Sequence, residues 1–181
     1  MNKIAILGNG DLSKALQTVI PNEFTVFKRP ELDFFNDATI QYTARALIDY
    51  PTIINCIGLF SGSDEQVMQS NFIGPMLLVK HLIELKYTGH LVMIGSHSAT
   101  WTSWPGIDYQ RLIYGNSKLA LRNLILGLAQ SHISNIDFTI IDITKFKSKM
   151  SNGQGYNPEK IAKLIYNITQ QDVKILHVEA H

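Results

Sequence analysis

A regular alternation of short β-rich runs with longer runs of helical spacing constrains the fold of this chain most. Strands are predicted over 3–7, 24–27, 52–57, 90–95, 136–142 and 173–178. Helical spacing occupies 12–20, 36–49, 64–86, 112–132 and 158–170. Strands that alternate with helices form a parallel sheet with right-handed crossovers and helices on both faces. The sequence therefore predicts an α/β chain with a doubly wound parallel sheet.

Length and composition limit the class of protein. The 181 residues are expected to form one domain, 1–181, and the hydrophobic fraction of 45% suits a globular core. A net charge of +1 provides no field toward nucleic acid or an anionic membrane. The single cysteine, Cys56, excludes an intramolecular disulfide, and no apolar stretch reaches the roughly 18 residues of a membrane span. We expect a cytoplasmic protein without nucleic-acid or membrane partners.

A glycine-rich turn follows the first predicted strand and opens the first helix. It reads G-x-G-x-x-S, and its residues are Gly8, Asn9, Gly10, Asp11, Leu12 and Ser13. The first glycine permits a tight turn, the second lets the backbone approach a pyrophosphate, and the small third residue lets helix and strand pack closely. A helix N-terminus then offers free N–H groups to phosphates. The motif predicts dinucleotide binding, and the alternative is a plain turn in which the glycines serve only backbone geometry.

The end of the second strand bears on which dinucleotide binds. That strand runs into Lys28 and Arg29, with no acid before Glu31. An acid at this point holds the adenosine ribose hydroxyls, whereas a basic residue accommodates a 2′-phosphate. The pair predicts that NADP(H) is preferred and NAD(H) is possible, with Arg29 the better phosphate ligand because of its forked guanidinium. The alternative is a solvated basic pair at a strand end.

Tyr114 and Lys118 lie four residues apart at the start of a helix-patterned run, so their heads share one helix face. An ordinary tyrosine has a pKa of about 10, too high for proton transfer at neutral pH. A nearby cation and the positive end of a helix are expected to lower it. The pair therefore predicts proton transfer to or from a carbonyl or alcohol, and the alternative is the edge of an amphipathic helix.

Together these segments resemble the short-chain dehydrogenase/reductase family, and the resemblance extends over most of the chain. It rests on the glycine turn, Asn55-Cys56-Ile57-Gly58, Asn71, Ile94-Gly95-Ser96 (the family has Ile-Ser-Ser), and Tyr114 with Lys118. The resemblance implies a Rossmann-type sheet of about six strands in the order 3-2-1-4-5-6. It also implies hydride transfer between a nicotinamide and a small carbonyl or alcohol substrate.

The resemblance also implies roles for four catalytic residues. Tyr114 would be the general acid or base. Lys118 would lower the pKa of that phenol and bind the nicotinamide ribose. Ser96, with Ser98 as the fallback, would hydrogen-bond the substrate oxygen. Asn71 would hold a water that connects the lysine to solvent.

The remaining cofactor contacts are implied in the same way. They are Asp33 at the adenine, Asn55, Ile57 and Gly58 beside the adenosine half, and Thr144 and Ser148 on the nicotinamide side. Relatives pair two helices across a two-fold axis, so a homodimer or homotetramer is implied. No second His, Cys or acid stands at a metal-ligand spacing beside His97, so no metal is expected.

Two departures from the family pattern leave a second function open. Ile143-Thr144 replaces the family's Pro-Gly after the fifth strand, and only a small segment, 145–157, lies where a substrate lid usually grows. A protein that binds NAD(P) as a regulator or sensor without turnover is therefore the alternative to an oxidoreductase.

Overall fold

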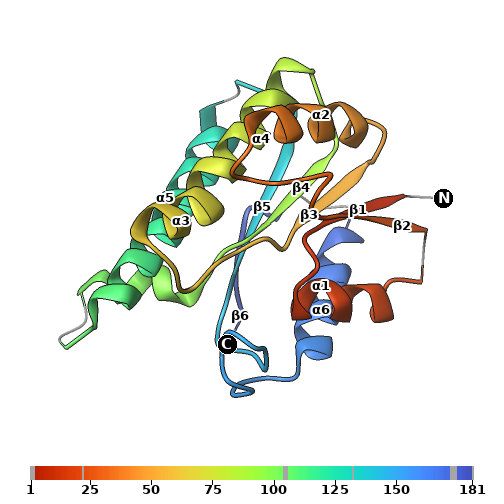
Figure 1. The fold of residues 1–181 in the computed structure, drawn as a ribbon. Coiled ribbons are helices and arrows are strands. Elements are labelled where there is room, and N and C mark those ends of the chain that lie inside the picture. Colours follow the sequence, from red (N-terminus) through yellow and green to blue (C-terminus); the bar gives the residue numbers. More distant parts are fainter. Residues whose placement is uncertain (1–2, 22, 104–105, 132, 172–174, 181) are drawn as a thin grey trace.

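A six-stranded parallel sheet forms the centre of the molecule (Figure 1). The structure is a computed structural model that describes residues 3–21, 23–103, 106–131, 133–171 and 175–180, with only the backbone of 101–103. The strands are β1 (Ile4–Leu7), β2 (Phe24–Phe27), β3 (Thr52–Asn55), β4 (His90–Ile94), β5 (Asp137–Ile143) and β6 (His177–Ala180). All neighbouring strands pair in parallel, in the order β2-β1-β3-β4-β5-β6.

This arrangement confirms the expected Rossmann-type sheet. The chain adds β2 on one side of β1 and then crosses to add β3 and the later strands on the other side. The expected order 3-2-1-4-5-6 has a third strand outside β2. Here residues 28–51 form a loop and the helix α2 in its place, so β2 is the edge strand. The strand numbered 4 in the expected order is therefore β3 of this chain, and the later strands shift by one in the same way.

The helices cover both faces of the sheet. They are α1 (Asp11–Val19), α2 (Asp37–Leu47), α3 (Asp64–Met68), α4 (Gly74–Glu84), α5 (Tyr109–Ser131) and α6 (Pro158–Thr169), with a π-helix η1 (Gln69–Ile73) and a 3₁₀ helix η2 (His97–Ser103). Helices α2, α4 and α5 lie on one face, and α1 and α6 lie on the other (Figure 1). Alternate residues of each strand therefore enter two separate cores.

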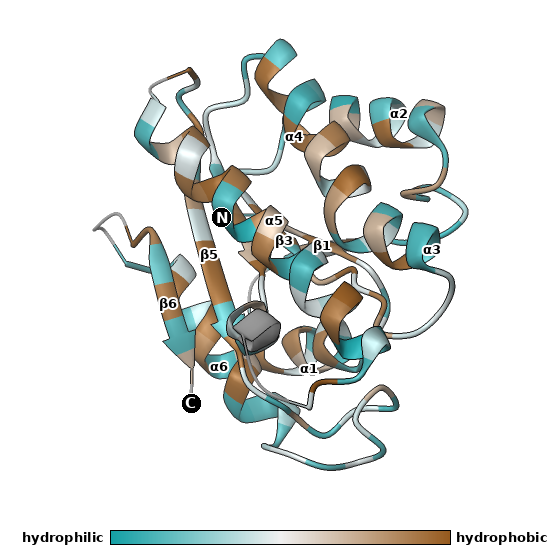
Figure 2. Ribbon diagram, turned by 90° about the vertical axis from the view of Figure 1, so that its left-hand side faces the viewer, coloured by the Kyte–Doolittle hydropathy of each residue, from teal (hydrophilic) through white to brown (hydrophobic). Residues whose placement is uncertain are grey.

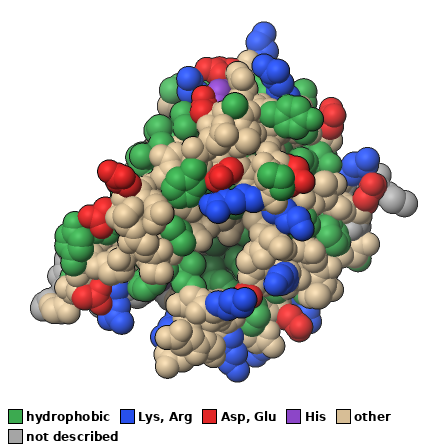
Figure 3. Space-filling model, in the orientation of Figure 1, with side chains coloured by type: hydrophobic (Ala, Val, Ile, Leu, Met, Phe, Trp, Pro, Cys, Tyr) green, Lys and Arg blue, Asp and Glu red, His purple; other side chains and the backbone are tan. Residues whose placement is uncertain are grey.

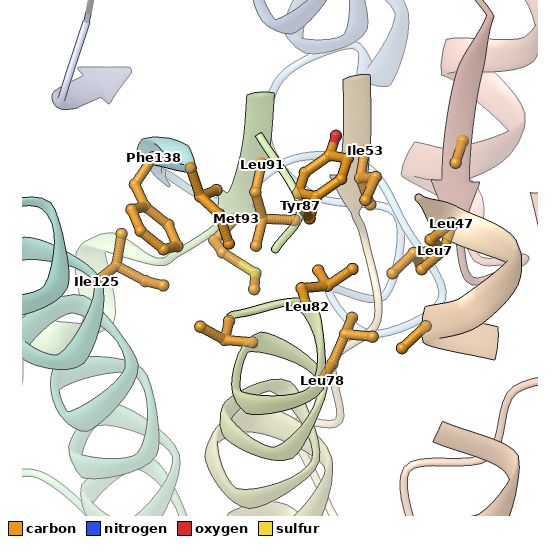
Figure 4. Packing of buried hydrophobic residues seen from close by; sticks show 14 of the residues in the cluster. Leu7, Leu47, Ile53, Leu78, Leu82, Tyr87, Leu91, Met93, Ile125 and Phe138 are labelled. Carbon is orange, nitrogen blue, oxygen red and sulfur yellow. The ribbon is translucent and has the colours of Figure 1, made fainter. Parts of the chain in front are cut away.

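The strand β1 illustrates this division. Ala5 and Leu7 belong to the core beneath α2, α4 and α5, whereas Ile4 and Ile6 belong to the core beneath α1 and α6. Figure 4 shows the first core, where Leu78 and Leu82 of α4 face the sheet residues Leu91 and Met93. In Figure 2 the strand β5 is mostly brown, as expected for a central strand buried on both faces.

The predicted helix 64–86 differs most from its prediction. The structure divides it into α3, η1 and α4, because a π-helical turn over Gln69–Ile73 interrupts the α-helical hydrogen bonding. Such single turns occur often at functional sites. Helix α3 begins with a capping box between Ser63 and Gln66.

The C-terminal strand lies later than predicted. The prediction covered 173–178, of which 173 and 174 lie outside the described residues, and β6 comprises His177–Ala180. The helix predicted over 112–132 begins at Tyr109, and its predicted last residue also lies outside the described part. Among the described residues, no helix is both long enough and apolar enough to cross a bilayer.

Candidate active site

The predicted site residues lie at the carboxyl edge of the sheet, where β1, β3, β4 and β5 end. Leu7 is in register with Asn55, and Ile94 is in register with Ile141 of β5, so the loops after these strands leave the same edge. The direction in which strands are added to the sheet reverses at β1, with β2 on one side of it and β3 on the other. Ligands of doubly wound sheets bind in the crevice at such a reversal.

The glycine turn has the geometry of a phosphate loop. Gly8 has a φ of +101°, and a Cβ there would lie 3.0 Å from Ile57 Cγ1, so a glycine is needed. The Ser13 hydroxyl donates to the Gly8 carbonyl at 2.7 Å and thereby joins helix α1 to the turn. Gly10 caps α1 without a side-chain hydrogen bond, and a Cβ there would have no atom within 4 Å. The space and the backbone donors that a phosphate requires are therefore present.

A pocket of about 310 Å³ opens beside this turn. Its walls come from the ends of β1, β2 and β3, and its lining residues are Gly8, Asn9, Lys28, Arg29, Leu32, Asp33, Phe34, Phe35, Ile57 and Ser70. Figure 3 shows a hollow with hydrophobic side chains on its floor and several Lys and Arg side chains around it. An apolar floor with basic groups at the rim suits a planar base that carries phosphates.

Arg29 is already engaged at the rim of this pocket. Its Nε lies 3.2 Å from Asp33 Oδ1, and its guanidinium lies 5.6 Å from the centroid of the Phe35 ring. Arg29 and Asp33 were each predicted to contact the adenosine half, and they lie at one pocket and bind each other.

The segment after β3 is fixed by two buried amides. Asn55 Oδ1 accepts the Ile57 backbone N–H at 3.1 Å and shapes the turn. Asn71 Oδ1 accepts the Leu59 N–H at 2.8 Å, and its Nδ2 donates to the Leu59 carbonyl at 2.7 Å. Gly58 lies in the same segment, close to Asn71 and Lys118. A Cβ at Gly58 would be 3.3 Å from Asn71 Oδ1 and 3.4 Å from Lys118 Nζ.

The π-helical turn brings Asn71 to this place. Asn71 is fully buried within η1, and its Nδ2 also lies 3.1 Å from Ser117 Oγ on α5. Ser117 in turn donates to the Tyr114 carbonyl at 2.7 Å. One amide therefore joins the β3 loop to the helix that carries Tyr114.

The structure brings Tyr114, Lys118 and Ser96 together. Ser96 lies near enough to the Tyr114 hydroxyl to lower the pKa of the phenol. Lys118 Nζ lies 6.0 Å from the centroid of the Tyr114 ring and donates to the Ile94 carbonyl at 3.1 Å. Ser98, the alternative to Ser96, accepts a hydrogen bond from it at 3.0 Å. Phe60 packs edge-on against the phenol, with ring centroids 5.1 Å apart.

The expected lowering of the Tyr114 pKa is wrong for this structure. Burial raises the pKa of the phenol, the nearby Ser96 side chain lowers it, and the charge of Asp142 raises it further. Tyr114 lies in the second turn of α5, which begins at Tyr109, so the end of the helix acts on it less than expected. Burial also lowers the pKa of Lys118 to about 8, against the opposing charge of Asp142. At neutral pH Tyr114 is therefore protonated as the neutral phenol, and Lys118 is mostly protonated as the cation.

Of the two residues predicted on the nicotinamide side, Thr144 is available to a ligand and Ser148 is not. Thr144 Oγ1 is buried and has no hydrogen-bond partner among the described residues, so a ligand amide at this edge would satisfy it. Ser148 Oγ accepts the Ser151 N–H at 3.2 Å and is used within a local turn. The next residue, Lys149, donates its N–H to Asp11 Oδ2 at 2.8 Å. Segment 145–157 therefore reaches the N-terminus of α1, but Ser148 itself serves the turn.

Two residues of the site were not expected from sequence. Phe60 contacts Tyr114 but belongs to no pattern that would distinguish it from an ordinary loop residue. Asp142 could have been found, because a lone acid within the apolar run Phe138–Ile143 is unusual in a buried strand.

Among the comparisons with known proteins, the one with solved structures supports the architecture. The sequence matches no model of a protein family, and no curated protein matches it significantly. Solved structures do match. The 3-alpha-hydroxysteroid dehydrogenase from Pseudomonas sp. B-0831, complexed with NADH, has a TM-score of 0.77 at 16% identity, over 98% of this chain and 95% of that one. The chain has the short-chain dehydrogenase/reductase fold.

Two further structures with this fold are similar. The short-chain dehydrogenase/reductase from Serratia marcescens BCRC 10948 has a TM-score of 0.76 at 14% identity, over 99% of this chain and 96% of that one. The alcohol dehydrogenase from the archaeon Thermococcus sibiricus, complexed with 5-hydroxy-NADP, has a TM-score of 0.74 at 12% identity, over 98% and 95% of the two chains. At these identities, the likeness establishes the fold.

Proposed function

We propose that this protein is an oxidoreductase of the short-chain dehydrogenase/reductase type that reduces a small carbonyl substrate with NADPH. The observation that carries the proposal is the meeting of Asn71, Ser96, Tyr114 and Lys118 at the sheet edge that also holds the glycine turn. These side chains come from three distant segments of the chain. A protein that only binds a dinucleotide would not require all four.

The residues present fit a nicotinamide dinucleotide. The open turn at Gly8 and Gly10 would hold the pyrophosphate, the pocket beside Ile57 would hold the adenosine, and the unpaired Thr144 hydroxyl would meet the carboxamide. When bound, the dinucleotide supplies or accepts a hydride. The structures complexed with NADH and with 5-hydroxy-NADP support a dinucleotide of this class.

The protein's own residues would handle the proton. Ser96 and Tyr114 would donate hydrogen bonds to the substrate oxygen, and Tyr114 would release its proton as negative charge develops there. Because burial raises the pKa of the phenol, Tyr114 starts as the proton donor, which favours reduction. Lys118 would stabilise the phenolate that remains, and Asn71 would keep the lysine and its loop in place.

The basic residues at the pocket rim support a preference for NADP(H). Lys28 and Arg29 line the pocket with Asp33, and Arg29 contacts Asp33 at 3.2 Å. A 2′-phosphate would replace that carboxylate as the partner of the guanidinium. Asp33 would accept the ribose hydroxyls of NAD(H), which keeps that cofactor possible.

The substitution Tyr114→Phe tests the proposal. We expect turnover of a panel of aldehydes, ketones and quinones to fall by about 10²- to 10⁴-fold, with NADPH affinity nearly unchanged. Tyr109→Phe is the matched control, since Tyr109 lies on the same helix and its hydroxyl contacts only the exposed Asp64 among the described residues. Equal turnover in wild type and Tyr114→Phe would reject the assignment.

The same assay separates the alternative. NADPH binding is followed by the fluorescence of the reduced nicotinamide, and NADH is titrated in parallel to measure the preference. Binding without turnover across the whole panel would favour a regulatory or sensor protein.

We also propose that the protein assembles as a homodimer, or as a homotetramer built from such dimers. Helices α4 and α5 carry apolar residues that pack against the core but stay partly exposed, among them Leu77, Ile83, Leu126 and Leu128. Figure 2 shows hydrophobic residues along both helices. Pairing of these helices across a two-fold axis would cover them.

A further inference from the structure

Asp142 is a buried carboxylate for which the proposed reaction has no stated use. Asp142 is buried, with 1% of its surface exposed. In the described part of the chain it is the only buried acid, and Lys118 is the only buried lysine or arginine. Burial of a charge is costly unless it is paired and hydrogen-bonded. The charge of Asp142 also acts on Lys118, since it raises the pKa of that lysine against the lowering by burial.

Both oxygens of Asp142 are held by specific donors. Oδ1 accepts the backbone N–H of Ser96 at 2.9 Å. Oδ2 accepts Arg122 Nη1 at 3.0 Å and lies 2.9 Å from His177 Nε2. The carboxylate therefore connects the candidate substrate-binding serine to a cation on α5 and to a histidine on β6.

Gly95 makes room for this carboxylate. A Cβ at Gly95 would lie 1.9 Å from Asp142 Oδ1, which no real contact allows. The family pattern noted above has a serine at this position, and a serine here would collide with the acid. Gly95 and Asp142 thus form a matched pair beside Ser96.

Resting on the proposed function, we propose that Asp142 is a positioning residue of this site. Through the Ser96 N–H it fixes where the substrate oxygen is bound, and Gly95, Arg122 and His177 hold it there. Asp142 touches neither substrate nor cofactor in this proposal, so it acts through Ser96 and through its charge.

The charge of Asp142 has a defined sign at the site. A negative group opposes formation of the Tyr114 phenolate and so raises the pKa of that phenol. The charged or titratable groups near Asp142 are Arg122, Lys118 and Tyr114 of α5 and His177 and Glu179 of β6. Cys56, directly after β3, acts on Lys118. Arg122 screens the carboxylate, so removing Asp142 or removing Arg122 should shift the phenol in opposite directions.

The test uses Asp142→Asn and Arg122→Gln in the full-length protein. Asparagine removes the charge, and an amide whose oxygen accepts the Ser96 N–H turns its NH2 donor toward the Arg122 Nη1 donor, so the group that holds Ser96 is no longer fixed. Arg122→Gln keeps the carboxylate and unmasks it. We expect Asp142→Asn to lower kcat by about tenfold or more with NADPH affinity unchanged. The titration of Tyr114, read as phenolate absorbance of each protein minus its Tyr114→Phe counterpart, should move to lower pH in Asp142→Asn and to higher pH in Arg122→Gln.

The outcomes separate the two proposals. Tyr114→Phe that retains turnover rejects the proposed function, whereas an inactive Tyr114→Phe with a fully active Asp142→Asn rejects only the role of Asp142. Loss of NADPH binding in parallel with kcat, or a Tyr114 titration that shifts the same way in both variants, also overturns that role. If circular dichroism shows that Asp142→Asn does not fold, the Tyr114 titration of Arg122→Gln decides. A shift of that titration to higher pH supports the role of Asp142, and no shift overturns it.

Discussion

At the scale of single residues, the site contains side chains whose burial disfavours their charged form and so shifts their pKa. Lys118 is a buried cation whose pKa is lowered to about 8, chiefly by desolvation. Cys56 shows the same effect on a thiol, since burial raises its pKa to about 12, which makes it an unreactive packing residue. Sequence alone predicted the identity of these groups, but the direction of their pKa shifts depends on burial that only the folded structure provides.

The lowered pKa of Lys118 predicts a stability that rises with pH. Below about 8 the folded state carries a buried charge. Between about 8 and 10.5 the unfolded chain binds a proton that the folded chain has released, so the free energy of unfolding increases with pH in that window. The difference between the two pKa values corresponds to on the order of 3 kcal/mol.

Urea unfolding of the cofactor-free protein at pH 7 and at pH 10 measures this effect. Lys118→Met is the comparison, because methionine keeps much of the side-chain volume without the charge. We expect the wild type to gain stability relative to Lys118→Met as the pH rises. A stability difference that is the same at both pH values would contradict the prediction.

Gly95→Ala tests the packing of the glycine against the acid. The new Cβ would meet Asp142 Oδ1, and we expect a loss of about 1–3 kcal/mol, as is typical for overpacking. A double-mutant cycle with Asp142→Ala should show that the two losses are not additive, because the acid is what the Cβ meets. Additive losses would place the strain elsewhere. Gly127→Ala, where a Cβ meets nothing within 4 Å, is the matched control.

At the scale of elements, the sequence predicted existence and type well and local irregularity poorly. The alternation of strands and helices predicted six strands, the last of them too early in the chain, because short apolar runs of β-branched and leucine residues between turn residues are a strong local signal. The π-helical turn over Gln69–Ile73 was not predicted, since its residues have ordinary helical spacing. Its cause is tertiary, because Asn71 must reach Leu59 on one side and Ser117 on the other.

The substitution Asn71→Ala should expose that tertiary role. It removes three hydrogen bonds and leaves the buried N–H and C=O of Leu59 unsatisfied, at a cost on the order of 3 kcal/mol. Chemical denaturation measures the loss. Asn167→Ala, on α6 far from this loop in sequence, is the control and should cost much less. An Asn71→Ala protein as stable as the wild type would show that the amide does not hold the loop.

At the scale of the whole molecule, the fold was predictable and the surface was not. The sheet edge that collects the site follows from chain topology, so Gly8, Ser96 and Tyr114 could be assigned to one place from order alone. The Arg29–Asp33 contact and the role of segment 145–157 depend on loop conformations, which carry no periodic signal.

Assembly is the prediction that belongs to this scale. If α4 and α5 form the subunit contact, Leu124→Arg on α5 should dissociate the dimer, because it places a charge among the partly exposed apolar residues. Light scattering coupled to gel filtration measures the mass of each species. Tyr42→Arg on the exposed face of α2 is the control and should leave the mass unchanged. A wild-type protein that is monomeric at all concentrations would rule the contact out.

The hydrogen bond from the Lys149 N–H to Asp11 Oδ2 joins positions 138 residues apart in the chain. Contacts of such long sequence separation form late, because the intervening chain must first lose its freedom. On a ribosome, the glycine turn would remain without this neighbour until the residues between Asp11 and Lys149 have all been made. Capacity to capture a dinucleotide should therefore be the last property to appear in a refolding time course, after helical content has already returned.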